Sequence, residues 1–234
     1  MVFPVNSDIV ENISDLFSLF ENRWPMPKPV IFRGESKQHE NFLCPSIFRE
    51  GQPQQEYDVY ETFHKEYNKQ NNRDVMFDKL HAEPHSCSLP FIGLAQHYGI
   101  KTRLLDVTLN PLVALYFSSI SNPEKDGYIF FFIENFLDIS PYYDFHALNV
   151  LIKSDAIGEY HPMDDTCLFY KPDWPNARIA AQHGAFILTK GFSQKIWNGG
   201  GIFKIPSNRK PEILKQLNRF GISHDSLFPS LTIT

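Results

Sequence analysis

The stretch Gln-His-Tyr-Gly-Ile-Lys-Thr-Arg-Leu-Leu-Asp-Val-Thr-Leu-Asn-Pro-Leu-Val-Ala-Leu-Tyr-Phe, residues 96–117, decides how the middle of this chain is expected to fold. Gly99 is typical of the residue just after a helix, so the sequence predicts a helix over residues 91–98. Residues 102–106 are compatible with a short strand or an extended loop. The Asn-Pro pair that follows is typical of a helix start, and the apolar residues after it predict a helix through Phe117.

Outward from this stretch, strand and helix patterns alternate along the chain. Short runs rich in β-branched and aromatic residues predict strands at 30–34, 128–133, 184–188 and 202–206. Apolar residues at helical spacing predict helices at 8–22, within 53–79 and at 211–220. These elements indicate an α+β fold, with a mixed or antiparallel sheet as its core and helices at its sides.

Domain organisation is predicted to be simple. Neither a repeat nor a clear linker interrupts residues 1–234, so we expect one domain. Its motif core spans about 30–190, and the helix at 8–22 and the strand and helix at 202–221 should pack on it. Prolines scatter through 135–174, which we interpret as a long excursion over the site with one helix near 144–154.

Charge and aromatic content set broad limits on function. The net charge of −5 gives no overall basic field to attract nucleic acid, although a local basic groove remains possible. Phe is abundant, with 21 copies, and such rings fill a core or form a cleft that stacks on flat ligands.

The cysteines and the apolar segments favour a cytoplasmic protein. Three widely spaced cysteines form no C-x-x-C pair, so neither a disulfide framework nor a zinc site is indicated. The N-terminus lacks the pattern of a signal peptide, and the longest apolar run, 128–133, is too short to cross a membrane. We therefore expect reduced thiols and no membrane association.

Phe32-Arg33-Gly34 is the first segment that could carry chemistry. An arginine at a strand end, followed by glycine, lets a guanidinium fork reach an anion while the backbone approaches it too. The alternative is a salt-bridged arginine beside a tight turn.

The second segment, Gln96 to Asp106, gathers an amide, an imidazole, a phenol, a guanidinium and a carboxylate. His97 could donate a proton or bind a ribose hydroxyl, and Asp106 could orient Arg103 or accept from a sugar hydroxyl. Alternatively, Arg103 and Asp106 form a buried structural pair and His97 caps a helix end. Because few residues separate these groups, we expect them to line one cleft with Arg33.

A third segment, residues 176–186, repeats the order Gln-His-Gly before a strand. Gly184 would permit a ligand or another backbone to approach closely. A plain turn between helix and strand, with solvated polar residues, explains the pattern equally well.

Several common motifs are absent. The sequence contains no P-loop, no dinucleotide-binding glycine fingerprint, no nucleophile elbow and no metalloprotease or EF-hand motif. No metal is predicted.

These segments together resemble the FRG domain family, which takes its name from the tripeptide at residues 32–34. The block at 96–117, the block at 178–186 and the ending around 217–228 are similar to the family pattern. The resemblance covers most of the chain, from about Phe32 to Phe228.

The order of these motifs also resembles that of ADP-ribosyltransferases, which cleave NAD at the nicotinamide glycosidic bond. The resemblance implies an ADP-ribosyltransferase-like fold, NAD as substrate, and catalytic roles for Arg33, His97, Asp106 and Gln182. It implies NAD-binding roles for Arg33, Gly34, Gln96, Tyr98, Arg103 and Thr108, with the arginines on the pyrophosphate and Tyr98 or a Phe on the nicotinamide. Gln182 stands where those enzymes carry a glutamate.

The resemblance further implies a bacterial toxin of a toxin–antitoxin or anti-phage system. Its expected acceptor is a nucleic acid such as RNA, or a target in translation, and its expected partner is an antitoxin protein. Two alternatives stay open: a nucleotide- or nucleic-acid-binding module without catalysis, and a hydrolase or nuclease of another class.

Overall fold

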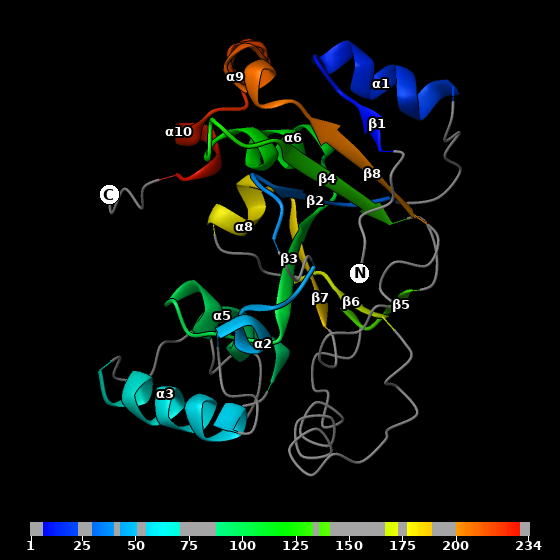
Figure 1. Cartoon of the computed structure of the whole chain (residues 1–234). Coiled ribbons are helices and arrows are strands. Elements are labelled where there is room, and N and C mark those ends of the chain that lie inside the picture. The colour runs from blue at the N-terminus through cyan, green and yellow to red at the C-terminus, as the bar shows by residue number, and fades with distance from the viewer. Residues whose placement is uncertain are drawn as a thin grey trace.

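The computed structural model describes residues 7–22, 30–39, 43–50, 55–70, 88–132, 136–140, 167–172, 177–188 and 200–229 (Figure 1). The predicted helix near 144–154 lies outside these residues. The described helices are α1 (Ile13–Asn22), α2 (Ser46–Glu50), α3 (Glu56–Gln70), α5 (Leu89–His97), α6 (Pro111–Ser119), α8 (Ala177–Ala181), the 3-10 helix η5 (Ser207–Arg209), α9 (Lys210–Arg219) and α10 (His224–Leu227).

The described strands form one eight-stranded sheet in the order β1-β8-β4-β2-β3-β7-β6-β5. They are β1 (Asp8–Ile9), β2 (Ile31–Glu35), β3 (Leu104–Thr108), β4 (Gly127–Phe132), β5 (Phe136–Asp138), β6 (Cys167–Tyr170), β7 (Gly184–Leu188) and β8 (Gly200–Ile205). The β1/β8 and β5/β6 pairs are parallel and the other pairs are antiparallel. The predicted α+β fold with a mixed sheet and flanking helices is confirmed.

Buried side chains lie on both faces of the central strands. In β4, Ile129 and Phe131 belong to a core that also contains residues of α1, α6 and α9, whereas Phe130 and Phe132 belong to a second core. A third core joins α3 and α5 to β3, β6 and β7. The helices therefore form two groups, one above the β4 end of the sheet and one beside β3, as Figure 1 shows.

The prediction for the N-terminus is wrong in part. Residues Asp8 and Ile9 form strand β1 rather than the start of a helix, because they pair with β8 far along the chain. Helix α1 begins four residues later, where the Asn12 side chain accepts a hydrogen bond from the Asp15 backbone N–H at 3.0 Å. An asparagine before the first helical residue satisfies a free backbone donor.

The prediction that 135–174 is only an excursion over the site is also wrong in part, because β5 and β6 extend the sheet beyond β7 through pairing between distant segments. Several other predictions differ from the structure only in their limits. Residues 102–106 do form a strand, but it runs from Leu104 to Thr108. Gly99 and Gly221 end helices with positive φ angles of 84° and 77°, which glycine adopts without strain. None of the helices among the described residues is both long and apolar enough to cross a membrane.

Two glycines allow helix α6 to lie on the sheet. A Cβ at Gly34 would clash with the Ala114 carbonyl oxygen, and one at Gly127 would clash with the Ser118 carbonyl oxygen. Gly34 was predicted to let the backbone approach an anion. The missing side chain instead leaves room for α6, although the Gly34 backbone still borders the site described next.

Candidate active site

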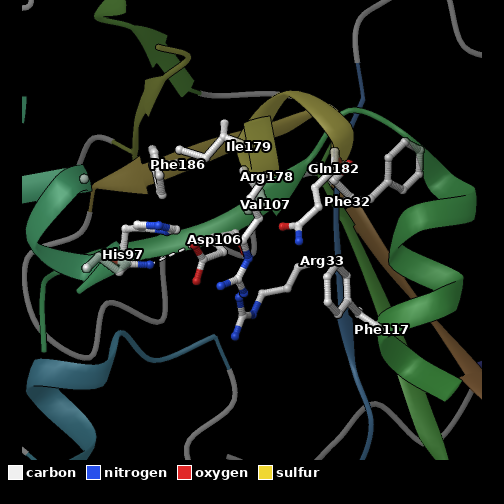
Figure 2. Close-up of a pocket in the computed structure, with 14 residues that line it drawn as sticks. Phe32, Arg33, His97, Asp106, Val107, Phe117, Arg178, Ile179, Gln182 and Phe186 are labelled. Atoms are coloured by element: carbon white, nitrogen blue, oxygen red, sulfur yellow. Dashed lines mark hydrogen bonds between the residues drawn. The ribbon is translucent and has the colours of Figure 1, made fainter. Parts of the chain in front are cut away.

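A pocket of about 330 Å³ opens where helices α5, α6 and α8 meet strands β2, β3 and β7 (Figure 2). Its lining residues are Phe32, Arg33, Gly34, Gly93, Gln96, His97, Asp106, Val107, Thr108, Phe117, Arg178, Ile179, Gln182 and Phe186. The structure thus brings the predicted site residues together, with the exceptions of Tyr98 and Arg103.

Arg33 is held in place from two sides. Its Nε donates to Glu35 Oε1 at 2.9 Å, and its Nη1 donates to the Asp106 backbone oxygen at 2.6 Å. Glu35 is buried, and within the described residues its second oxygen has no hydrogen-bond partner. A guanidinium group has five N–H donors, so further donors of Arg33 remain for a ligand. In Figure 2 its guanidinium points into the pocket beside Asp106.

Asp106 supplies a carboxylate whose position is fixed by a chain of hydrogen bonds. Gln96 Nε2 donates to Asp106 Oδ1 at 2.7 Å. The Gln96 oxygen in turn accepts from the Thr102 hydroxyl, which orients the amide with its nitrogen toward Asp106. Thr102 is buried just before β3, so this series of hydrogen bonds is anchored at the sheet.

The protein around Asp106 changes its acidity. Burial among protein atoms raises the pKa of Asp106 above its ordinary value, while Arg33 and Arg178 act in the opposite direction. The side chain is nevertheless exposed, because it faces the open pocket rather than the core. A carboxylate poised between desolvation and two cations is the type of group found in functional sites.

Arg178 is a site residue that was not among the predicted ones, although it lies in the third segment. It lies in α8, its guanidinium sits 4.7 Å from the centre of the Phe228 ring, and it faces Asp106 in Figure 2. Two guanidinium groups therefore share the pocket with one carboxylate. The signal in the sequence was an arginine at the start of the third segment, but only the pairing of β7 with β3 brings it beside Arg33.

Gln182 and Thr108 connect the pocket walls. The Thr108 hydroxyl donates to the Gln182 backbone oxygen at 2.7 Å, and Gln182 Nε2 donates to the Leu227 backbone oxygen at 3.0 Å. Both residues line the pocket, but these hydrogen bonds tie β3, the turn after α8 and α10 together. Next to them His183 has a φ of 48°, a conformation that is uncommon for residues other than glycine.

Arg103 does not reach the pocket. Its side chain is fully buried, and Nε donates to both carboxylate oxygens of Glu56 at 2.9 and 3.1 Å. Tyr60 also donates to Glu56, at 2.6 Å. The expectation that Arg103 contacts a phosphate is therefore corrected, and so is the alternative that it pairs with Asp106. Helix α3 supplies the partner instead.

Tyr98 also lies outside the pocket. It is 59% exposed and packs on α3, with its ring centre 5.7 Å from those of Phe63 and Tyr67. The rings that do line the pocket are Phe32, Phe117 and Phe186. An aromatic contact to a flat ligand would therefore come from phenylalanine, which was the other option in the sequence analysis.

His97 is the last residue of α5 and lines the pocket next to Gln96. In Figure 2 its ring lies on the same side of the pocket as Asp106. Among the described residues, no group of three or more His, Cys, Asp or Glu side chains is arranged to hold a metal ion.

No curated protein and no solved structure matches the chain. One family model matches part of it, residues 28–127. This part includes the pocket residues Arg33, Gln96, His97 and Asp106, whereas Arg178 lies beyond it. Residues 28–127 match the FRG domain family.

Proposed function

We propose that the pocket binds NAD and that the protein is an ADP-ribosyltransferase-like enzyme. The observation that carries the proposal is the placement of two arginine side chains, Arg33 and Arg178, beside the Asp106 carboxylate in one pocket. The match of residues 28–127 to the FRG domain covers two of these three residues, Arg33 and Asp106.

The arginines suit the pyrophosphate of NAD. A guanidinium fork binds two phosphate oxygens at once, so Arg33 and Arg178 together offer two such forks to the pyrophosphate. Arg33 is held by Glu35 and by the β3 backbone, so little side-chain freedom is lost when it binds. The phenylalanine rings of the pocket supply an apolar surface for the nicotinamide ring.

Asp106 suits the reacting ribose. When the bond between C1′ of the ribose and the nicotinamide nitrogen breaks, the bonding electrons leave with nicotinamide and the sugar becomes cationic. An ionised carboxylate beside this oxocarbenium-like state lowers its energy. The acceptor's nucleophile then forms a bond to C1′ and loses its proton, for which His97 is the nearby base.

A second candidate is nucleotide binding without catalysis. Asp106 is the single carboxylate among the described residues that line the pocket, and it already accepts a hydrogen bond from Gln96. The pocket could therefore hold a nucleotide with its arginines and leave the glycosidic bond intact.

Labelled NAD distinguishes the two. The purified chain is incubated with cell extract and with NAD labelled on the adenylate part, and free nicotinamide and labelled macromolecules are measured. We expect both products, and we expect Asp106→Asn to bind NAD but to release nicotinamide at least about 100-fold more slowly. The control is Glu212→Gln, an exposed carboxylate on α9. Tight NAD binding with no nicotinamide release would favour the second candidate.

The proposal extends to a toxin that modifies nucleic acid or a translation component and is restrained by an antitoxin. Expression of the chain alone should slow cell growth, whereas the Arg33→Ala variant should not. Nuclease and protease treatment of the labelled product identifies the acceptor class. Harmless expression of protein that is active in the NAD assay would contradict the toxin role.

A further inference from the structure

A second hollow, of about 230 Å³, adjoins the pocket. Residues of α2, of the turn after α5 and of β3 line it. It shares Arg33, Gln96 and Asp106 with the first pocket. The two cavities therefore meet at the residues to which the proposed reaction assigns the pyrophosphate and the ribose.

The size of the first pocket leaves part of NAD without a site. Ligand pockets span about 300–1,000 Å³, and 330 Å³ lies at the lower end of this range. NAD consists of two nucleotides joined at the pyrophosphate. If the nicotinamide mononucleotide half occupies the first pocket, the adenylate half, which carries the second phosphate, must extend past Arg33, and the adjoining hollow begins there.

The charge of the second hollow fits a phosphorylated nucleoside. Arg49 and Lys101 line it, and both are exposed. Among the described residues that line it, Asp106 is the single carboxylate, and it already accepts from Gln96. Two exposed cations at the rim of a cavity attract phosphate and orient an incoming nucleotide.

The walls of the second hollow are held by backbone contacts. The Ser46 hydroxyl accepts from the Thr102 backbone N–H at 3.0 Å, and the Ile47 N–H donates to the Thr102 oxygen at 3.2 Å. These bonds fix the start of α2 against the residues that lead into β3. Pro45 and Ile100 add apolar surface that a base can contact. The wall formed by α2 and the residues before β3 is therefore preformed.

We propose that this second hollow is the subsite for the adenylate half of NAD, with Arg49 and Lys101 contacting its phosphate. The assignment rests on the proposed function for the identity of the dinucleotide. A nucleoside monophosphate such as AMP has the same chemistry and should bind there by itself.

Calorimetric titration of the full chain with AMP, nicotinamide mononucleotide and NAD tests the assignment. The variant Arg49→Glu/Lys101→Glu should weaken AMP and NAD binding by about tenfold or more. It should change the binding of nicotinamide mononucleotide by less than about twofold. The matched control is Lys215→Glu/Arg219→Glu, which changes the net charge equally on exposed residues of α9 and should change no affinity.

Three results would overturn the assignment. The first is equal weakening of AMP and nicotinamide mononucleotide. The second is no AMP binding by the unsubstituted chain while it binds NAD. The third is a double variant with unchanged AMP and NAD affinity but weaker binding of a short single-stranded RNA. That result would show that the hollow binds the acceptor instead. Failure of the proposed function would look different. If AMP and NAD binding depend on Arg49 but NAD releases no nicotinamide, the enzymatic activity is contradicted while the subsite assignment stands.

Discussion

Arg103 lies one residue before strand β3, and Arg33 reaches the backbone of the same strand at Asp106, yet the surroundings of the two guanidinium groups differ. Arg103 is fully buried and bound by Glu56, and Tyr60 completes the contacts of that carboxylate. Arg33 keeps 16% of its side chain exposed and shares an open pocket with Arg178 and Asp106. The same residue type thus closes one region and leaves the other accessible to a ligand.

The buried pair contributes to the stability of the fold, whereas the pocket arginines are available for ligand binding. An enclosed ion pair cannot bind an external anion, and removal of one partner leaves an unpaired buried charge. In the pocket, Arg33 is paired with Glu35, but the guanidinium groups of Arg33 and Arg178 still face an open cavity where donors can reach a ligand. We therefore expect substitutions in the first region to lower stability and substitutions in the second to lower ligand binding and turnover.

The largest expected effect is on stability, for Glu56→Ala. The change leaves the Arg103 guanidinium buried without its carboxylate, which should lower the free energy of unfolding by about 3–5 kcal/mol. For a chain of this size the melting temperature should fall on the order of 10 °C. Thermal unfolding followed by circular dichroism measures it.

Glu61→Ala is the control for this change, because Glu61 forms an exposed pair with Lys65 on the same helix. It should leave the melting temperature unchanged. At a temperature where both variants are folded, NAD cleavage per folded molecule should match the unsubstituted chain. An unchanged melting temperature for Glu56→Ala would show that the buried pair does not hold α3 on the sheet.

Arg33→Lys should lower activity and leave stability nearly unchanged, the reverse of Glu56→Ala. Lysine keeps the charge but lacks the fork that reaches Glu35, the Asp106 backbone and the ligand together. We expect kcat/KM for nicotinamide release to fall by about 10²–10³-fold and the melting temperature to change by less than about 3 °C. Arg103→Lys is the paired variant, and it should lose stability while it retains activity per folded molecule. Equal loss of stability and activity in Arg33→Lys would identify a structural arginine.

The parts of the fold that rest on local patterns could be predicted from the sequence. The apolar run of β4 and the Asn-Pro start of α6 specify their elements within a few residues, and both are present. The two-residue strand β1 could not be predicted, since it exists only through its pairing with β8. Its residues carry no strand signal of their own.

The candidate site shows the same division. Arg33 and Asp106 lie in segments whose composition indicated chemistry, and the pairing of β2 with β3 brings them together. The partner of Arg103 could not be found by spacing, because Glu56 lies 47 residues earlier whereas Asp106 lies close by in the sequence. The role of Arg178 was hidden for a similar reason, since β7 has to pair with β3 before the two arginines meet.

The smallest expected effect is a change in pH dependence, for Gln96→Leu. Desolvation already raises the pKa of Asp106, and the hydrogen bond from Gln96 is one of the contacts that lower it. Without that donor the pKa rises further. Catalysis needs the ionised carboxylate, so activity is lost as the pH falls through this pKa, and the acidic limb of kcat/KM should move to higher pH.

Gln182→Leu is the matched control, because Gln182 lines the same pocket but its amide donates to Leu227 rather than to Asp106. Its acidic limb should stay in place. An unmoved limb in Gln96→Leu, or an equal movement in both variants, would show that the limb reports a group other than Asp106, and the open region would then lose its proposed catalytic carboxylate.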